Sequence, residues 1–96
     1  MAPDLSLRDS LAIGERVAYR ELDGEGVLLD LEHGIYFGLN HVGARIWALI
    51  AEHGSLEAVH AALVREFDAQ PDVLASDLLA LCTDLTSRGL VRVISS

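Results

Sequence analysis

Apolar and polar residues alternate along the first third of the chain, in the pattern that is typical of half-buried strands. Val17 and Tyr19 alternate with arginines, and two further apolar runs occupy residues 27–31 and 35–39. Short turns that contain glycine separate the three runs. Because turns of this length join neighbouring strands, the pattern predicts an antiparallel meander of three strands.

After position 40 the apolar residues recur at helical spacing, with residues suited to helix ends between them. Residues that can begin a helix are Asn40, Ser55 and Pro71, and glycines that can end one are Gly54 and Gly89. The third helix carries a predicted buried stripe that consists of Leu74, Leu78, Leu81 and Leu85. Three helices are therefore expected, and the alternating residues after Gly89 are expected to form one last strand.

The order of these elements predicts an α+β fold, in which a three-stranded antiparallel sheet is followed by a three-helix winged helix-turn-helix. A chain of 96 residues is enough for one domain with one modest core. Residues 1–14 are interpreted as a flexible N-terminal arm that is able to add one short strand, and residues 15–96 as the folded domain. Trp47 is expected in the core, between the first helix and either the sheet or the third helix.

The formal net charge of −8 limits the partners that the surface can bind. Nucleic acids and anionic membranes both attract basic proteins, so neither is expected as a partner, whereas a basic peptide or protein is. The first residues lack the pattern of a signal peptide, and no apolar run approaches the roughly 20 residues that span a bilayer. The protein is therefore expected in the cytoplasm.

The residues that usually carry chemistry do not have the spacing of a known catalytic or metal-binding motif. The four histidines and the one cysteine lack the close pairs of common zinc sites. Cys82 lies among the leucines of the third helix, where a small buried side chain is a simpler interpretation than a nucleophile. The acidic residues are scattered, and the glycines form no phosphate-binding loop. We expect no cofactor, no metal site and no enzyme activity of the chain acting alone.

Two segments resemble the PqqD-like family. In Leu29–Trp47 a glycine turn precedes an aromatic strand, and Leu-Asn then opens a helix; Asp77–Leu90 is an apolar helix that begins with Asp and ends in Gly-Leu. The resemblance covers roughly residues 15–94. It implies the fold described above, and it implies that the protein is a precursor-peptide recognition element. In that role the leader of a precursor peptide joins the sheet beside the third strand and lies against the third helix.

Members of this family serve several systems that modify ribosomally made peptides. Some act alone in the synthesis of pyrroloquinoline quinone, and others work with a leader peptidase and a cyclase that make lasso peptides. The stretch from Gly34 to Asn40 is more similar to the lasso and related systems. The resemblance therefore implies two partners: the leader of a precursor peptide, and a leader peptidase or other peptide-modifying enzyme.

Eight residues of the third strand and third helix are candidates for peptide binding. They are Ile35, Tyr36, Phe37, Gly38, Asp77, Ala80, Leu81 and Asp84. An edge strand offers unpaired backbone groups to a guest strand, and its side chains alternate between two faces. On the helix, Ala80 leaves space for a guest side chain, while Asp77 and Asp84 are suited to pair with basic residues. The alternatives are that the aromatic residues belong to the core and that the aspartates only face solvent.

Two other functions are compatible with parts of the sequence. A winged-helix DNA-binding regulator has a similar fold, but the third helix offers three aspartates against one arginine, which is a poor surface for phosphates. The chain could also be a small subunit of an enzyme whose active site needs another chain. A pull-down experiment and the identity of the neighbouring genes distinguish these interpretations.

Overall fold

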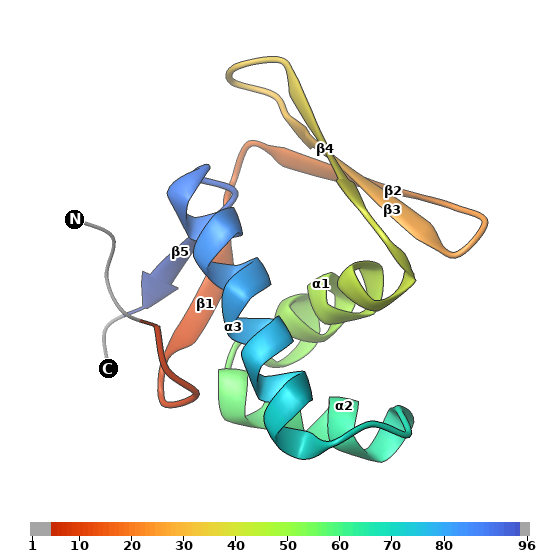
Figure 1. Cartoon of the computed structure of the whole chain (residues 1–96). Helices are drawn as coiled ribbons and strands as arrows, with labels where there is room; N and C mark the ends of the chain where they lie inside the picture. Colours follow the sequence, from red (N-terminus) through yellow and green to blue (C-terminus); the bar gives the residue numbers. More distant parts are fainter. Residues whose placement is uncertain (1–4, 95–96) are drawn as a thin grey trace.

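The computed structural model describes residues 5–94, and these form two small sheets and three helices (Figure 1). In chain order the elements are β1 (Ser10–Ile13), β2 (Val17–Leu22), β3 (Glu25–Asp30), β4 (Ile35–Leu39), α1 (His41–His53), α2 (Leu56–Glu66), α3 (Pro71–Ser87) and β5 (Val91–Ile94). The predicted α+β fold, with a three-stranded antiparallel sheet followed by three helices, is confirmed. β1 and β5 form an additional antiparallel pair.

The larger sheet has the strand order β2-β3-β4, so β4 lies at one edge and β2 at the other. Asp23 and Gly24 form the turn between β2 and β3, and both have positive φ angles, of 54° and 82°. Two positive φ angles characterise the type I′ hairpin turn, for which Asp-Gly is a preferred pair. The turn between β3 and β4 spans residues 31–34, where the Asp30 carboxylate accepts two backbone hydrogen bonds, of 3.0 and 3.2 Å.

The N-terminal arm contributes a short strand, β1, as the sequence allowed. It pairs with β5, and Leu11 lies opposite Val93. Leu11 is buried, and its N–H donates to the carbonyl of Gly54 at the end of α1 (2.8 Å). The packed part of the chain therefore includes β1, although this strand lies within the predicted arm. Residues 1–4 of that arm lie outside the described residues.

The helix ends lie where the capping residues predict them. The Asn40 side chain accepts a hydrogen bond from the N–H of Gly43 (2.8 Å), and the Ser55 hydroxyl accepts one from the N–H of Ala58 (3.4 Å). Gly54, after α1, has a φ of 73°, a left-handed conformation that glycine adopts without strain. Because Asn40 directly follows β4, the capping interaction places the start of α1 at the end of the edge strand.

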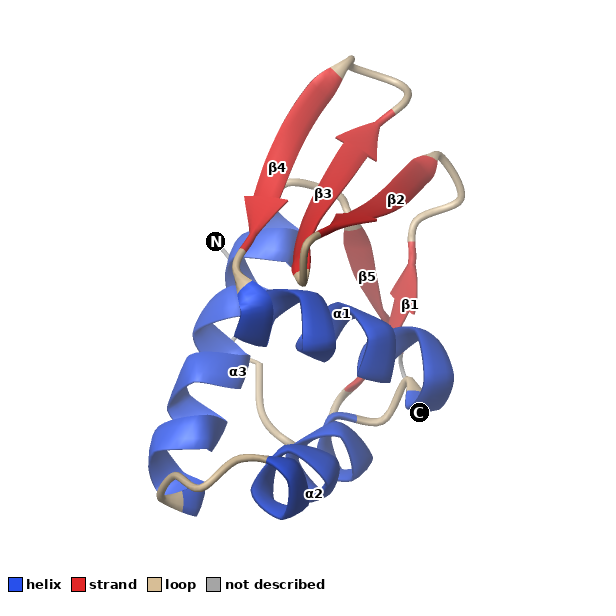
Figure 2. Cartoon of the chain, turned by 90° about the vertical axis from the view of Figure 1, so that its right-hand side faces the viewer, coloured by secondary structure: helices blue, strands red, loops and turns tan. Residues whose placement is uncertain are grey.

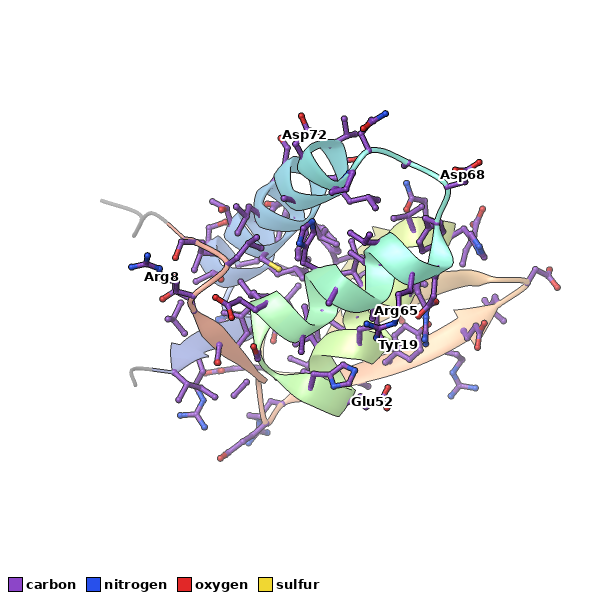
Figure 3. All side chains as sticks on the ribbon, turned by 90° about the horizontal axis from the view of Figure 1, so that it is seen from below. Arg8, Tyr19, Glu52, Arg65, Asp68 and Asp72 are labelled. Carbon is purple, nitrogen blue, oxygen red and sulfur yellow. The ribbon has the colours of Figure 1, made fainter. Side chains whose placement is uncertain are left out.

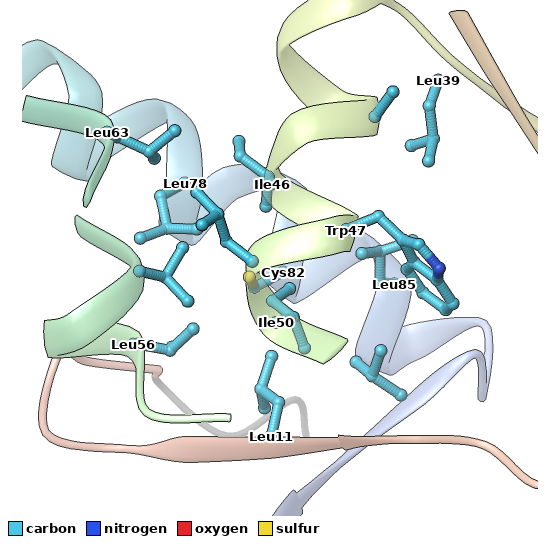
Figure 4. Packing of buried hydrophobic residues seen from close by; sticks show 14 of the residues in the cluster. Leu11, Leu39, Ile46, Trp47, Ile50, Leu56, Leu63, Leu78, Cys82 and Leu85 are labelled. Carbon is cyan, nitrogen blue, oxygen red and sulfur yellow. The ribbon is translucent and has the colours of Figure 1, made fainter. Parts of the chain in front are cut away.

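The core is built around α1, which contacts both sheets and α2 (Figure 4). Trp47 is only 4% exposed, and its ring stacks on Tyr19 of β2 at a centroid distance of 6.4 Å. Its predicted place in the core is confirmed. The predicted buried stripe of α3 is wrong for Leu81, which is only partly buried. Cys82 is fully buried instead, because it follows Leu78 by four residues on the side of α3 that faces the core.

The larger sheet stands on one side of α1, and α2 lies on the other side (Figure 2). α3 packs against α2 and β5. Charged side chains such as Arg65, Asp68 and Asp72 point away from the interior (Figure 3). This arrangement leaves a groove between β4 and α3, with the first turns of α1 at its base.

Candidate functional site

The backbone of β4 is paired on one side only, because β4 lies at the edge of its sheet. The N–H of Leu31 donates to the carbonyl of Arg16 (2.8 Å), so the odd-numbered residues at this end of β3 turn their backbone groups toward β2. Backbone groups alternate in direction along an antiparallel strand, and the even-numbered residues of β3 therefore turn toward β4. Leu28, one of these, lies opposite Phe37.

It follows that Phe37 turns its N–H and C=O toward β3, whereas Tyr36 and Gly38 turn theirs toward the open edge. These two residues would form the hydrogen bonds with any strand added beside β4. Their side chains leave the edge accessible. Tyr36 is 70% exposed on the face of the sheet opposite to Phe37, and nothing lies within 4 Å of a Cβ placed on Gly38.

A groove of about 420 Å³ lies between β4, the first turns of α1, and α3. Its lining residues are Phe37, Gly38, Leu39, Asn40, Val42, Gly43, Ile46, Asp77 and Leu81. Four of the predicted site residues therefore meet here, two from the strand and two from the helix. Among the described residues that line the groove, Asp77 carries the ionisable side chain, and most of the others are apolar. The groove is suited to apolar guest side chains with one basic group beside them.

A smaller hollow of about 280 Å³ adjoins the groove at Phe37. Ile35 and Phe37 line it from β4, and Arg88 lines it from the end of α3. The Arg88 guanidinium carbon lies 4.8 Å from the centroid of the Phe37 ring, in a cation–π contact. Nε of Arg88 donates to the Asp84 carboxylate (3.0 Å), which holds the side chain in this position.

The structure thus brings five of the eight candidate residues to the two hollows and places three outside them. Tyr36 contributes its backbone to the open edge, while its side chain points away from the groove. Ala80 is exposed on α3, next to Leu81 of the lining. Asp84 is engaged by Arg88 and does not line the groove.

Several groove residues were not among the predicted ones. Asn40, Val42 and Ile46 come from the start of α1, where the sequence pattern predicts only capping and core packing. The signal that could have identified them is their position directly after an edge strand, because that position puts one helical face beside the strand's open side. Arg88 is a further addition, because the fold places the end of α3 over Phe37.

An ion pair stabilises the turn between β3 and β4. Nδ1 of His33 lies 2.8 Å from the Asp30 carboxylate. This hydrogen bond lowers the pKa of Asp30 and raises the pKa of His33. Both residues also line the smaller hollow, so the Asp30 carboxylate lies near Arg88 there.

The other residues that could carry chemistry, namely Cys82 and the possible metal ligands, form no reactive or metal-binding site within residues 5–94. Burial raises the pKa of the Cys82 thiol to about 12, so the reactive thiolate is scarce near neutral pH. Within residues 5–94, no three His, Cys, Asp or Glu side chains come close enough together to hold a metal ion. In the same part of the chain, the helices are too short or too polar to cross a membrane.

The surface of α3 is acidic, whereas a winged-helix regulator needs a basic recognition helix. Asp72 and Asp77 are exposed on this helix, and they outnumber Arg88, the one arginine at its end. Such a surface repels the phosphates of DNA. The DNA-binding interpretation therefore lacks the positive charge on which it depends.

Comparison with known proteins identifies a family and two similar structures. The sequence profile described as coenzyme PQQ synthesis protein D (PqqD) matches residues 25–91. TbiB1 in complex with the TbiA(beta) leader peptide has a similar structure, with a TM-score of 0.80 and 32% identity over 88% of this chain and 98% of that chain. Lasso peptide synthetase B1 complexed with the leader peptide is also similar, with a TM-score of 0.76 and 26% identity over 85% and 96%.

No curated protein matches the chain. The matched profile nevertheless spans more than half of the sequence, including the edge strand β4, the groove and α3. The chain therefore belongs to the PqqD family.

Proposed function

We propose that this protein binds the leader segment of a ribosomally made precursor peptide and presents that precursor to the enzymes that modify it. The observation that carries the proposal is the open edge of β4, where the backbone groups of Tyr36 and Gly38 face outward beside an apolar groove. A peptide that pairs with this edge directs alternate side chains toward α3. The similar structures of TbiB1 and lasso peptide synthetase B1 each hold a leader peptide, which supports the same role here.

On the strand side, the proposal assigns backbone and side-chain roles to alternate residues. Tyr36 and Gly38 supply the hydrogen bonds that fix the register of the leader. Ile35 and Phe37 supply apolar surface to those leader residues that face the helix. Phe37 lines both hollows, so we expect it to contact the largest part of the bound leader.

On the helix side, α3 closes the groove and supplies charge. Leu81 contributes apolar surface, and the small side chain of Ala80 leaves room at the helix surface for a guest side chain. Asp77 is the partner for a basic residue of the leader. Asp84 takes part indirectly, because it holds Arg88 over the Phe37 ring.

Presentation requires a second partner, and a leader peptidase or another peptide-modifying enzyme fits this role. Members of the PqqD family are peptide-binding adaptors without catalysis of their own, so the chemistry belongs to that partner. The likeness to lasso peptide synthetase B1 favours a lasso-peptide system over a pyrroloquinoline quinone system. Because precursor peptides are made on ribosomes, we propose that the protein acts in the cytoplasm.

The test is calorimetric titration of the protein with a synthetic leader from a precursor gene adjacent to its own. We expect a dissociation constant of roughly 0.01–10 μM, which corresponds to about 7–11 kcal/mol. The backbone amide signals of residues 35–38 and 77–81 should shift when the leader binds. Binding without shifts in these two segments would contradict strand addition, and the absence of binding would contradict the adaptor role itself.

The charge of Asp77 offers a second measurement with a matched control. Asp77→Lys should weaken the binding of a basic leader more at low salt than at high salt, because screening removes the charge interaction first. Asp68→Lys makes the same change of net charge at an exposed position away from the groove. If both variants lose affinity equally, only the overall charge of the protein matters and Asp77 has no specific role.

A further inference from the structure

The site beside β4 has two ends of different charge, and Phe37 lies between them. Asp77 is the charged residue in the lining of the larger groove, and Arg88 reaches into the smaller hollow on the other side. Along β4, Leu39 belongs to the acidic end and Ile35 to the basic end. A peptide paired with β4 would therefore pass from the Asp77 carboxylate to the Arg88 guanidinium within a few residues.

Arg88 is held in a conformation that leaves hydrogen-bond donors free for a ligand. Its contact with Phe37 and its hydrogen bond to Asp84 both restrict the side chain. The hydrogen bond to Asp84 uses Nε, so the N–H groups of the two terminal nitrogens remain as donors. The Arg88 side chain is 50% exposed, and an incoming carboxylate can reach these groups without moving the backbone.

The surroundings of Arg88 are less acidic than the protein as a whole. Arg16 and Arg92 line a hollow of about 420 Å³ that continues from Arg88. Three acidic residues line the same hollow, namely Glu15, Asp30 and Glu32. With Arg88 included, three arginines and three acidic residues line this hollow, whereas the chain carries a net charge of −8. Two of the acidic groups near Arg88 already have partners, since Asp30 is bonded to His33 and Asp84 to Nε of Arg88 itself. An acidic guest residue approaching Arg88 avoids the general repulsion of the surface.

We propose that Arg88 is a specificity residue, which receives an acidic side chain of the bound peptide while Asp77 receives a basic one. This inference rests on the proposed function, and it adds the charge pattern that the site selects. Ile35 and Leu39, at the two ends, are four residues apart on one face of β4. A paired guest strand has the same rise per residue, so its acidic and basic residues lie about four positions apart on the face toward α3.

The first experiment uses a displayed library of short random peptides, selected on the immobilised wild-type protein. We expect enriched peptides to carry an acidic and a basic residue about four positions apart. Enrichment of peptides without an acidic position overturns the role of Arg88 and leaves the adaptor role intact. A selection that enriches no peptide at all contradicts the proposed function instead, so the two failures are distinguishable.

The second experiment measures one enriched peptide and its isosteric variant, in which the carboxylate is replaced by an amide. Wild-type protein should bind the variant about fivefold more weakly at low salt, the loss expected for one half-exposed charge pair. Arg88→Gln protein should bind both peptides equally. Arg20→Gln is the matched control, because Arg20 is exposed on β2 opposite Val27, on the far face of the sheet, and it should keep the fivefold difference.

Reversing the charge at position 88 distinguishes direct recognition of the peptide from a purely structural role of Arg88. Arg88→Glu should bind the enriched peptide poorly and recover affinity for a peptide with lysine at the acidic position. Wild-type protein should show the reverse preference, and this arm does not depend on any variant folding. Equal affinity of wild-type protein for the carboxylate, amide and lysine peptides overturns the proposal. Failure of the lysine peptide to restore binding by folded Arg88→Glu overturns it as well.

Discussion

Replacing Tyr36 by proline should remove most of the peptide binding and leave the fold nearly intact. Proline has no backbone N–H, and the N–H of Tyr36 faces the open edge of β4 rather than β3. The hydrogen bonds that hold β4 in its sheet come from the neighbouring residues, among them Phe37. Proline is tolerated on edge strands where its missing N–H would face solvent.

The expected size of the effect follows from what the substitution removes. One backbone hydrogen bond between protein and guest contributes about 0.5–1.5 kcal/mol, and the proline ring also keeps the guest carbonyl away from the edge. A total loss of about 2–3 kcal/mol corresponds to about 30- to 150-fold weaker binding. The unfolding free energy should fall by only about 1 kcal/mol, from the adjustment of φ toward the value of proline.

The assay is calorimetric titration with the leader, combined with thermal unfolding followed by circular dichroism. Tyr36→Ala is the matched control, because it removes the exposed side chain and keeps the N–H; its affinity should stay within about threefold of the wild-type value. Unchanged affinity of a folded Tyr36→Pro protein would show that the leader does not pair with β4. Unfolding of Tyr36→Pro would show that its N–H faces β3, and that the assigned alternation of backbone groups is wrong.

Three further predictions concern stability. Trp47→Ala should lower the melting temperature by about 15–25 °C, since truncating a buried Trp costs about 3–5 kcal/mol; a nearly unchanged melting curve would contradict its core position. Gly26→Ala should destabilise the fold by about 1–3 kcal/mol, because its Cβ would lie 2.7 Å from the Tyr19 ring, whereas Gly38→Ala, with open space around it, should be close to neutral in the same melts. The hydrogen bond to Asp30 raises the pKa of His33, so the contribution of His33 to stability is present below pH 6.5 and is lost as the pH rises through the folded pKa. The same bond lowers the pKa of Asp30, so the contribution of Asp30 is present above pH 3.8 and is lost as the pH falls through its folded pKa. The melting temperatures of wild-type protein and His33→Gln should therefore differ most near pH 5 and converge above neutral pH, and a difference that is independent of pH would refute this role of the ion pair.

Local structure could be predicted from the sequence because its causes are close together along the chain. Asn40 and Ser55 accept hydrogen bonds from residues three positions ahead, and Asp23-Gly24 closes a hairpin of adjacent strands. Such interactions depend on residue type and spacing alone, so the helices begin where the pattern predicts. The second strand, β3, spans Glu25–Asp30 and is therefore shifted slightly from the predicted run at residues 27–31. The pattern also predicted the strand Ile35–Leu39 and the leucine-rich third helix as elements, whereas their selection as the peptide site came from the resemblance to the PqqD-like family.

The details of the site depend on how distant elements meet, and spacing does not specify that. Which backbone groups of β4 face outward depends on the register of three strands, and a shift of one residue would exchange Tyr36 with Phe37. Leu81 and Cys82 are neighbours on one helix, and only the direction from which the core approaches α3 buries the cysteine and leaves the leucine beside the groove.

The longest-range contacts were the least accessible to the sequence. β1 pairs with β5 at the other end of the described chain, and Arg88, directly after α3, lies over Phe37 of β4. No local sequence pattern predicts such pairs, because residues this far apart in the chain come into contact only after the helices between them have packed around α1. The sequence thus determined an open strand, a helix and the residues suited to a groove. Tertiary packing decided that the strand and the helix face each other, with Asp77 at one end of the site and Arg88 at the other.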